Sequence, residues 1–278
     1  MTTRCVGVNT YGYIWGPDIR DCMGGLGSKG YTMFEGVINP PHLDIEIPQE
    51  RRRELRGYMK DNGFSFSSLN LPSLDTNLAS PFAATRRYSV GMFQRAIDLA
   101  ADLGAPNLIT VPGRLNPLLP PDRASLDGWV EESIAALIPH ARERGVRLAL
   151  ENVPFASLPR ARDLADFLDR MGNEDVLGVC YDVANAHFIG ESLRAGIEVL
   201  GGRMHLMHCS DTTCSIWRHD VVGCGDVPWS ELADALEASA WDGPLLLEII
   251  DQDPDTGVVS SHDALAAKGI IDTRKQST

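Results

Sequence analysis

The sequence lacks the features that mark a membrane, secreted or disulfide-bonded protein. No stretch of uncharged apolar residues approaches the roughly 18 that a membrane-spanning helix needs. Residues 1–10 contain no basic segment followed by an apolar one, so no secretory signal is predicted. The six cysteines form no CxxC pair, which favours reduced thiols over a disulfide framework or a zinc finger. We therefore expect a cytoplasmic protein that has no membrane partner.

Positive charge is also scarce. Lysine and arginine total 25 against 38 aspartate and glutamate residues, which gives a net charge of −13. An acidic surface repels phosphate backbones, so nucleic acid is not an expected partner. No low-complexity linker or charge block divides the 278 residues. We expect one domain over residues 1–278, with a polar tail at about 272–278 whose composition is typical of a disordered end.

Glycines that are typical of helix ends recur along the chain. From Gly30 onward they lie 26 to 42 residues apart, a spacing that suits one strand and one helix with their loops. Short apolar runs accompany these glycines and are typical of strands buried on both faces. The runs are Cys5–Val8, Tyr31–Phe34, Phe64–Leu69, Leu108–Val111, Val146–Leu150, Val176–Tyr181, Met204–Met207 and Leu245–Leu247.

The segments between these runs have helical periodicity. Arg87–Leu103 and Leu126–Arg144 each carry an apolar stripe, and Pro139 is expected to kink the second or to mark a boundary in it. Gly243 is expected to end a later helix. Eight strand–helix units predict an α/β fold, a closed (β/α)₈ TIM barrel. An open, doubly wound sheet is the alternative, although no GxGxxG motif follows the first run.

Four side chains that can bind metal ions follow the last four expected strands. Each alone has an ordinary structural explanation, such as an ion pair, a helix cap or a core histidine. The C-terminal ends of the strands form the active-site face of a TIM barrel, so the four would converge there. Three carboxylates close together repel one another unless a cation offsets their charge, and this donor set suits Mn²⁺, Mg²⁺, Co²⁺ or Zn²⁺. The predicted ligands are Glu151, Asp182, His208 and Glu248.

The segments around these residues resemble a known family. They read LALEN at 148–152, YDVANAH at 181–187, HCSD at 208–211, RHDVVGCG at 218–225 and LLE at 246–248. In their order and spacing they are similar to the sugar isomerase and epimerase branch of the xylose isomerase-like TIM barrels. The resemblance implies that the four predicted ligands hold one divalent ion, with manganese expected first. It also implies that Glu151 and Glu248 move protons.

The sequence departs from this family at several positions. Many members have a histidine three residues after the aspartate, where this chain has Asn185, with His187 two residues further on. Epimerases often have an arginine six residues after the metal-binding histidine, and this position is Cys214. Related apurinic-site endonucleases need further zinc ligands at positions that here are Val111, Asn185 and Trp217. The metal site is therefore expected to be intact, the substrate stays open, and a nuclease is not favoured.

Further polar and aromatic residues are expected to contact the substrate. Aromatic side chains after the first strand could stack on a sugar ring, and polar groups at the ends of the second and third strands could bond its hydroxyls. Simple packing or structural pairing is the alternative for each. The expected substrate contacts are Tyr11, Trp15, Glu35, Asn70, Asn185, His187, Arg218 and His219.

Together these features predict a metal-dependent isomerase or epimerase of a ketose or related polyol carbonyl compound. The reaction would remove a proton next to a metal-bound carbonyl and pass through an enediolate. A dehydratase of the inosose or dehydroshikimate type is the alternative, since the same intermediate can expel a hydroxyl. A non-catalytic sugar-binding barrel ranks lower. The expected partner is a small sugar or polyol, and assembly into a homodimer or homotetramer is left open.

Overall fold

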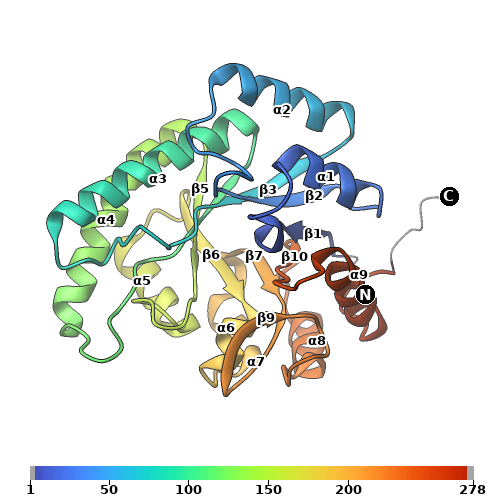
Figure 1. Ribbon diagram of the computed structural model, residues 1–278. Coiled ribbons are helices and arrows are strands. Elements are labelled where there is room, and N and C mark those ends of the chain that lie inside the picture. Colours follow the sequence, from blue (N-terminus) through green and yellow to red (C-terminus); the bar gives the residue numbers. More distant parts are fainter. Residues whose placement is uncertain (1–3, 274–278) are drawn as a thin grey trace.

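Eight parallel strands close into a barrel in the computed structural model, which describes residues 4–273 (Figure 1). Around the barrel the order is β1-β10-β7-β6-β5-β4-β3-β2. Each strand overlaps one of the predicted apolar runs, so the predicted (β/α)₈ barrel is confirmed. The strands are β1 (Val6–Asn9), β2 (Met33–Val37), β3 (Ser65–Asn70), β4 (Asn107–Thr110), β5 (Arg147–Glu151), β6 (Leu177–Asp182), β7 (Met204–Cys209) and β10 (Leu245–Leu247).

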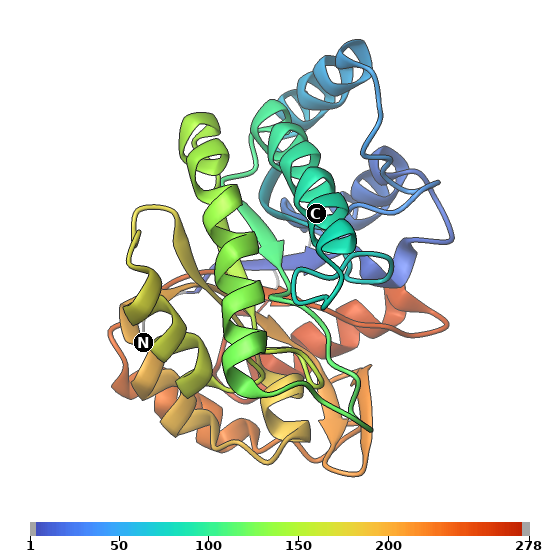
Figure 2. The ribbon, with the colours of Figure 1, turned by 90° about the vertical axis from the view of Figure 1, so that its left-hand side faces the viewer.

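Helices cover the outside of the barrel, and α3 and α4 run side by side along one flank (Figure 2). None of the helices between residues 4 and 273 is both long and apolar enough to cross a membrane. The helices are α1 (Ile19–Gly27), α2 (Gln49–Asp61), α3 (Ala83–Leu103), α4 (Arg123–Arg144), α5 (Ala161–Met171), α6 (Val183–Phe188), α7 (Leu193–Leu200), α8 (Trp229–Ala238) and α9 (Pro254–Ala267), with short 3₁₀ turns η1 (Tyr11–Tyr13) and η2 (Gly201–Arg203).

The apolar residues form two layers. A large cluster fills the space between the strands and the helices. A smaller one fills the inside of the barrel and consists of Ile109, Ala149, Cys180, Leu206 and Leu246. Burial on both faces explains why these strands appear in the sequence as continuous apolar runs. The filled interior leaves only the rim of the barrel free for chemistry.

Local sequence signals fix most of the helix ends. Gly104 and Gly145 end α3 and α4 with φ angles of 80° and 67°, a left-handed conformation that favours glycine. Two expected helix boundaries are wrong. None falls at Pro139, because α4 continues through it and buried apolar side chains hold the turns on both sides, while the kink stays a prediction. Gly243 does not end a helix, because α8 already ends at Ala238.

A hairpin that was not predicted follows β7. Its antiparallel strands are β8 (Asp211–Thr213) and β9 (Ile216–Asp220). The buried Asp211 carboxylate accepts bonds from the backbone N–H groups of Gly223 and Val227 at 2.7 and 3.1 Å. It also accepts a bond from the indole N–H of Trp229 at 3.1 Å. These bonds hold the loop after the hairpin and fix the position of β9 at the rim.

Gly113→Ala is expected to destabilise the protein by about 2–4 kcal/mol. Gly113 follows β4 with a φ angle of 109°, and an added Cβ would lie 2.3 Å from the Cβ and 2.5 Å from the backbone nitrogen of Ala79. Urea unfolding measures the change. Gly128→Ala is the matched control, because Gly128 is exposed on α4 and has open space around it. Equal stability of the two variants would contradict this reading of the β4 loop.

Candidate metal centre

The four predicted ligands lie together at the rim of the barrel. Glu151 and Asp182 end β5 and β6, His208 is on β7, and Glu248 directly follows β10. The register sets His208 beside Asp182 of β6 and Leu246 of β10. The His208 Nδ1 atom lies 3.3 Å from Glu151 Oε1, 3.7 Å from Asp182 Oδ2 and 3.1 Å from Glu248 Oε2. One donor atom from each of the four residues lies within 4.8 Å of the others.

The donor atoms that face one another are buried and unpartnered. Asp182 Oδ2, His208 Nδ1 and Glu248 Oε2 are shielded from solvent and have no hydrogen-bond partner among the described residues. A buried polar atom left in this state costs about 1–3 kcal/mol. Ligands bound at about 2.0–2.2 Å to one shared ion lie about 3 Å apart, close to the separations seen here. The four residues therefore fit a divalent cation.

The crowding of charge shifts the pKa values of these groups. Burial raises the pKa of Glu151 to about 7, and His208 opposes this effect. Burial would also raise the pKa of Asp182, but the neighbouring His219 and His208 outweigh it and lower the value. Burial would lower the pKa of His208, but nearby groups, including Cys180, Glu35 and Glu248, raise it well above its usual range. Without a bound ion, the imidazoles of His208 and His219 thus offset the negative charge of the carboxylates. A bound cation can take over this role.

Glu35 orients His208 from the side opposite the cluster. It is fully buried, and its Oε2 lies 3.1 Å from His208 Nε2, while Ser68 and Asn70 donate further hydrogen bonds to it. A carboxylate that holds one ring nitrogen turns the other toward a metal site. The expectation that Glu35 contacts substrate does not fit this position, because it has no exposed surface. Asn9 Nδ2 donates to both Glu35 and Glu248 and ties the two together.

Glu35→Gln is expected to weaken metal affinity by about 10- to 100-fold, because the amide holds the imidazole of His208 less firmly. Metal titration against a competing chelator measures the effect. The control is Glu54→Gln, an exposed carboxylate on α2 that pairs only with Arg51, and its affinity should equal that of the wild type. Wild-type affinity in Glu35→Gln would remove Glu35 from this role.

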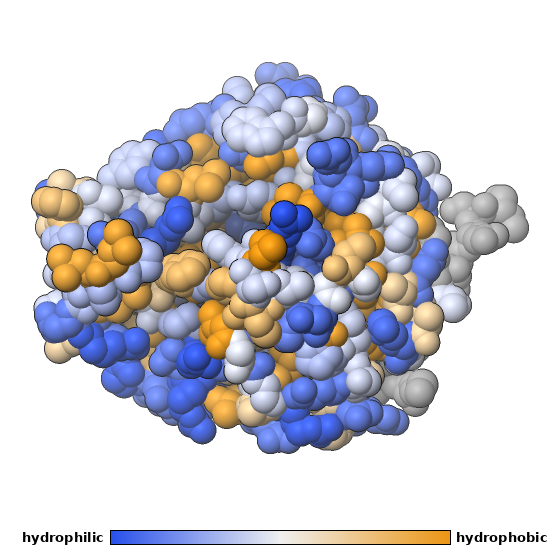
Figure 3. Space-filling view, turned by 60° about the horizontal axis from the view of Figure 1, so that its bottom comes forward, coloured by the Kyte–Doolittle hydropathy of each residue, from blue (hydrophilic) through white to orange (hydrophobic). Residues whose placement is uncertain are grey.

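A cavity of about 580 Å³ opens onto two of the four candidate ligands. Glu151 and Glu248 lie in its wall, with exposed fractions of only 5% and 4%. Figure 3, with the lower side of Figure 1 brought forward, shows polar and apolar side chains around a hollow near the centre of the face. Five of the expected substrate contacts line the cavity, namely Tyr11, Asn70, Asn185, Arg218 and His219. The Nδ1 atom of His219 lies 3.4 Å from Glu248 Oε2.

Two other expected contacts lie outside the cavity lining. Trp15 is 77% exposed. His187 turns the other way, with its Nε2 at 2.6 Å from Asp226 Oδ1. Residues two positions apart on a helix differ by about 200° in direction, so when Asn185 of α6 faces the cavity, His187 cannot. The structure thus places Trp15 and His187 outside the cavity lining, and their contact with a substrate stays a prediction.

Several cavity residues were not predicted. Arg114 lines the cavity. It directly follows the Pro–Gly pair after β4, and this position was the sequence signal that could have predicted it. Trp217 lines it because β9 forms, and its indole N–H donates to Asn185 Oδ1 at 2.7 Å. Phe155 lines it from the loop after β5 with a φ angle of 63°. This left-handed backbone conformation costs about 1–2 kcal/mol in a residue other than glycine. No local sequence signal predicts it at Phe155.

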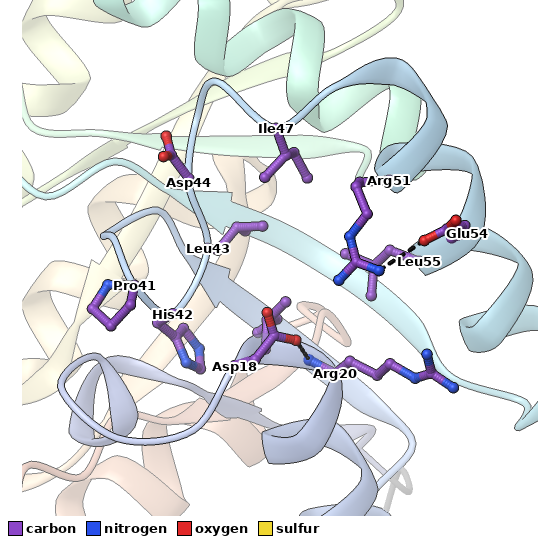
Figure 4. Close-up of a pocket in the computed structure, with 11 residues that line it drawn as sticks. Asp18, Arg20, Pro41, His42, Leu43, Asp44, Ile47, Arg51, Glu54 and Leu55 are labelled. Atoms are coloured by element: carbon purple, nitrogen blue, oxygen red, sulfur yellow. Dashed lines mark hydrogen bonds and ion pairs between the residues drawn. The ribbon is translucent and has the colours of Figure 1, made fainter.

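A second cavity lies beside α1 and α2, apart from the metal-binding cluster (Figure 4). It has a volume of only about 80 Å³ and is lined by residues such as Asp18, His42 and Arg51. None of the four candidate ligands contributes to it. The chemistry therefore belongs to the larger cavity.

The comparison with protein families agrees with this architecture. The sequence model of the xylose isomerase-like TIM barrel matches residues 27–268. The chain belongs to this family.

Solved structures of the xylose isomerase-like fold superpose on nearly the whole chain. A D-tagatose 3-epimerase-like protein has a TM-score of 0.82 at 18% identity, covering 96% of this chain and 97% of its own. A D-psicose 3-epimerase crystallised with D-fructose has a TM-score of 0.80 at 20% identity, covering 98% and 99%. The IolI protein with a bound zinc atom has a TM-score of 0.79 at 13% identity, covering 96% and 98%. Identities this low show the shared fold alone.

Among curated sequences, the chain is similar to a probable endonuclease 4 of Mycobacterium ulcerans, with 28% identity over 186 residues. The match covers 63% of this chain and 70% of that protein. Within the xylose isomerase-like family, endonucleases need extra zinc ligands, as noted above. The three positions concerned, Val111, Asn185 and Trp217, all line the cavity here, and neither valine nor tryptophan binds zinc. Val111 and Trp217 therefore cannot supply the further zinc ligands that the resemblance to endonucleases would require.

Proposed function

We propose that the protein is a metal-dependent isomerase or epimerase of a ketose or related polyol carbonyl compound. One observation carries this proposal: buried donor atoms of Asp182, His208 and Glu248, which form no hydrogen bond among the described residues, converge with Glu151 beside a cavity that the two glutamates line. That sugar epimerases share the fold supports it. A small sugar or polyol is the proposed partner.

The cation that these residues fit supplies Lewis-acid polarisation of a substrate carbonyl when it is bound. We propose Mn²⁺ first, with Mg²⁺, Co²⁺ or Zn²⁺ as alternatives, because three carboxylates and one imidazole accept any of them. Asp182 and His208 are fully buried and serve only as ligands.

The two glutamates carry the proton chemistry in this proposal. Glu151 and Glu248 lie on either side of His208 and both reach the cavity wall. One carboxylate removes the proton from the carbon next to the carbonyl, and the other returns a proton to the opposite face or to the neighbouring carbon. The first outcome is epimerisation and the second is isomerisation. Their low exposure keeps water away from the transferred proton.

A dehydratase is the second candidate, because His219 lies on the same wall, 3.4 Å from Glu248 Oε2. Its imidazole could protonate a hydroxyl that leaves from the carbon beyond the carbonyl. His187 lies outside the cavity lining, with its Nε2 2.6 Å from Asp226 Oδ1, and is not proposed for this role.

One experiment separates these reactions. The manganese-loaded protein is incubated in D₂O with ketoses, an inosose and dehydroshikimate, and the products are followed by NMR. An isomerase or epimerase incorporates deuterium next to the carbonyl and yields an isomer. A dehydratase yields a conjugated carbonyl compound that absorbs in the near ultraviolet. Neither product nor exchange from any compound in the panel would argue for a non-catalytic barrel.

A further inference from the structure

Large apolar side chains line the mouth of the cavity above its acidic floor. Trp217 and Phe155 are 38% and 49% exposed, and Leu74 and Ile250 are 53% and 42% exposed. Four of the exposed large apolar residues in the described part of the chain thus gather on one cavity. Clustered exposed apolar side chains mark a binding surface, whereas isolated ones need no explanation.

Three aromatic rings pack together in a group that we name the aromatic platform: Phe155 and Trp217, which line the cavity, and Phe188, which packs against both. The ring centroid of Phe155 lies 6.2 Å from each of the other two, and Phe188 and Trp217 stack at 6.4 Å with an interplanar angle of 29°. The bond from Trp217 Nε1 to Asn185 Oδ1 fixes the indole. Rings held in place before binding lose little entropy when a flat ligand stacks on them.

The aromatic platform continues directly into the metal centre. The ring centroids of Trp217 and His219 are 6.3 Å apart, and His219 Nδ1 lies 3.4 Å from Glu248 Oε2. A ligand bound next to the donor atoms therefore needs to extend by only about the width of one ring to contact the platform. The cavity volume of about 580 Å³ lies within the range of about 300–1,000 Å³ that is usual for drug-sized ligands. A free hexose would leave the platform uncovered.

We propose that the aromatic platform is a subsite for a flat apolar group of the substrate, and that the substrate is a glycoside with an aromatic aglycone whose sugar ring carries the ketone that the proposed reaction needs. The sugar part of this inference rests on the proposed function. The polar floor takes the sugar and the platform takes the aglycone. The affinity of the platform for an aromatic group needs no turnover, so it can be tested by binding alone.

The test compares two probes, 4-nitrophenyl β-D-glucopyranoside and methyl β-D-glucopyranoside, by calorimetric titration of the manganese-loaded protein. We expect the aryl glucoside to bind at least tenfold more tightly than the methyl glucoside. Trp217→Ala should remove most of this preference and leave the methyl glucoside unchanged. Tyr88→Ala is the matched control, since Tyr88 is an exposed aromatic residue on α3 (53%) and lies outside the cavity lining, and it should keep the full preference.

Equal binding of the two probes, or failure of both to bind, would overturn the inference. So would loss of both affinities together in Trp217→Ala with an unchanged melting temperature. A wild-type dimer that Trp217→Ala converts to a monomer would assign the platform to a second copy of the chain instead. Deuterium exchange into a free ketose without an aryl preference would refute this inference alone. An aryl preference without exchange on any carbonyl substrate would refute the proposed function alone.

Discussion

Glu248→Gln and Glu151→Gln are each expected to lower the exchange of the substrate α-proton with D₂O by about 10²–10⁴-fold. An amide oxygen still binds a cation, but an amide cannot accept a proton at neutral pH. Both carboxylates reach the cavity wall with little exposure, so no bulk water replaces them as the base. The measurement is NMR of a turned-over ketose in D₂O at saturating Mn²⁺.

Metal content decides how this result is interpreted. Each variant is assayed for bound manganese, and only a variant with about one ion per chain counts as a test of proton transfer. Glu131→Gln is the control, because Glu131 lies on α4 and pairs with Arg170 outside the cavity. Exchange at nearly the wild-type rate in both cavity variants, with metal bound, would show that other groups move the proton.

The convergence of the four candidate ligands could be predicted because barrel topology converts chain order into spatial order. Glu151, Asp182, His208 and Glu248 end neighbouring strands, and β5, β6, β7 and β10 lie next to one another in the closed sheet. Knowing where each apolar run ends was therefore enough to place the four side chains at one rim. This prediction depends on placing each strand end to the exact residue, because a shift of one position along a strand turns the side chain to the other face of the sheet.

The rest of the cavity depends on local backbone geometry that neither the apolar runs nor the helical periodicity of the sequence predicts. Asn185 and His187 looked equivalent in the sequence, and only the short α6 helix separates them. Trp217 faces the cavity because β8 and β9 form a hairpin. The Asp211 carboxylate fixes the loop after this hairpin by accepting hydrogen bonds from backbone N–H groups 12 and 16 residues further along the chain. Phe155 depends on a left-handed backbone conformation that its sequence does not favour. Cytoplasmic location and oligomeric state stay predictions.

Glu35 shows a third limit of sequence-based reasoning. Its place at the end of an early strand suggested contact with a substrate, and the barrel does bring it to the centre. However, the β2–β3 register shifts between Phe34 and Glu35, and Asn9, Ser68 and Asn70 enclose the carboxylate. The side chain therefore lies beneath the donors and supports His208. Distinguishing a ligand from its supporting partner required side-chain contacts, which strand ends alone do not give.

Removing the metal from the wild-type protein is expected to abolish turnover and to lower the melting temperature by about 5–10 °C. Binding at a free metal concentration about 100-fold above the dissociation constant stabilises a folded protein by about 2.7 kcal/mol, and each kcal/mol corresponds to about 2–4 °C in a chain of this size. The physical reason is local, since the buried atoms Asp182 Oδ2, His208 Nδ1 and Glu248 Oε2 form no hydrogen bond among the described residues. Chelation followed by calorimetry, metal analysis and activity assays checks both effects.

His208→Ala provides the matching variant for this experiment. It should bind less than a tenth of an ion per chain, because it loses the imidazole that contacts all three carboxylates. Added Mn²⁺ should then restore activity to the chelated wild type but not to His208→Ala. His140→Ala serves as control, since His140 pairs with Asp98 far from the rim strands and should respond like the wild type. A chelated wild type that keeps its melting temperature and its activity would show that the buried carboxylate cluster works without a cation, and the proposed chemistry would have to be abandoned.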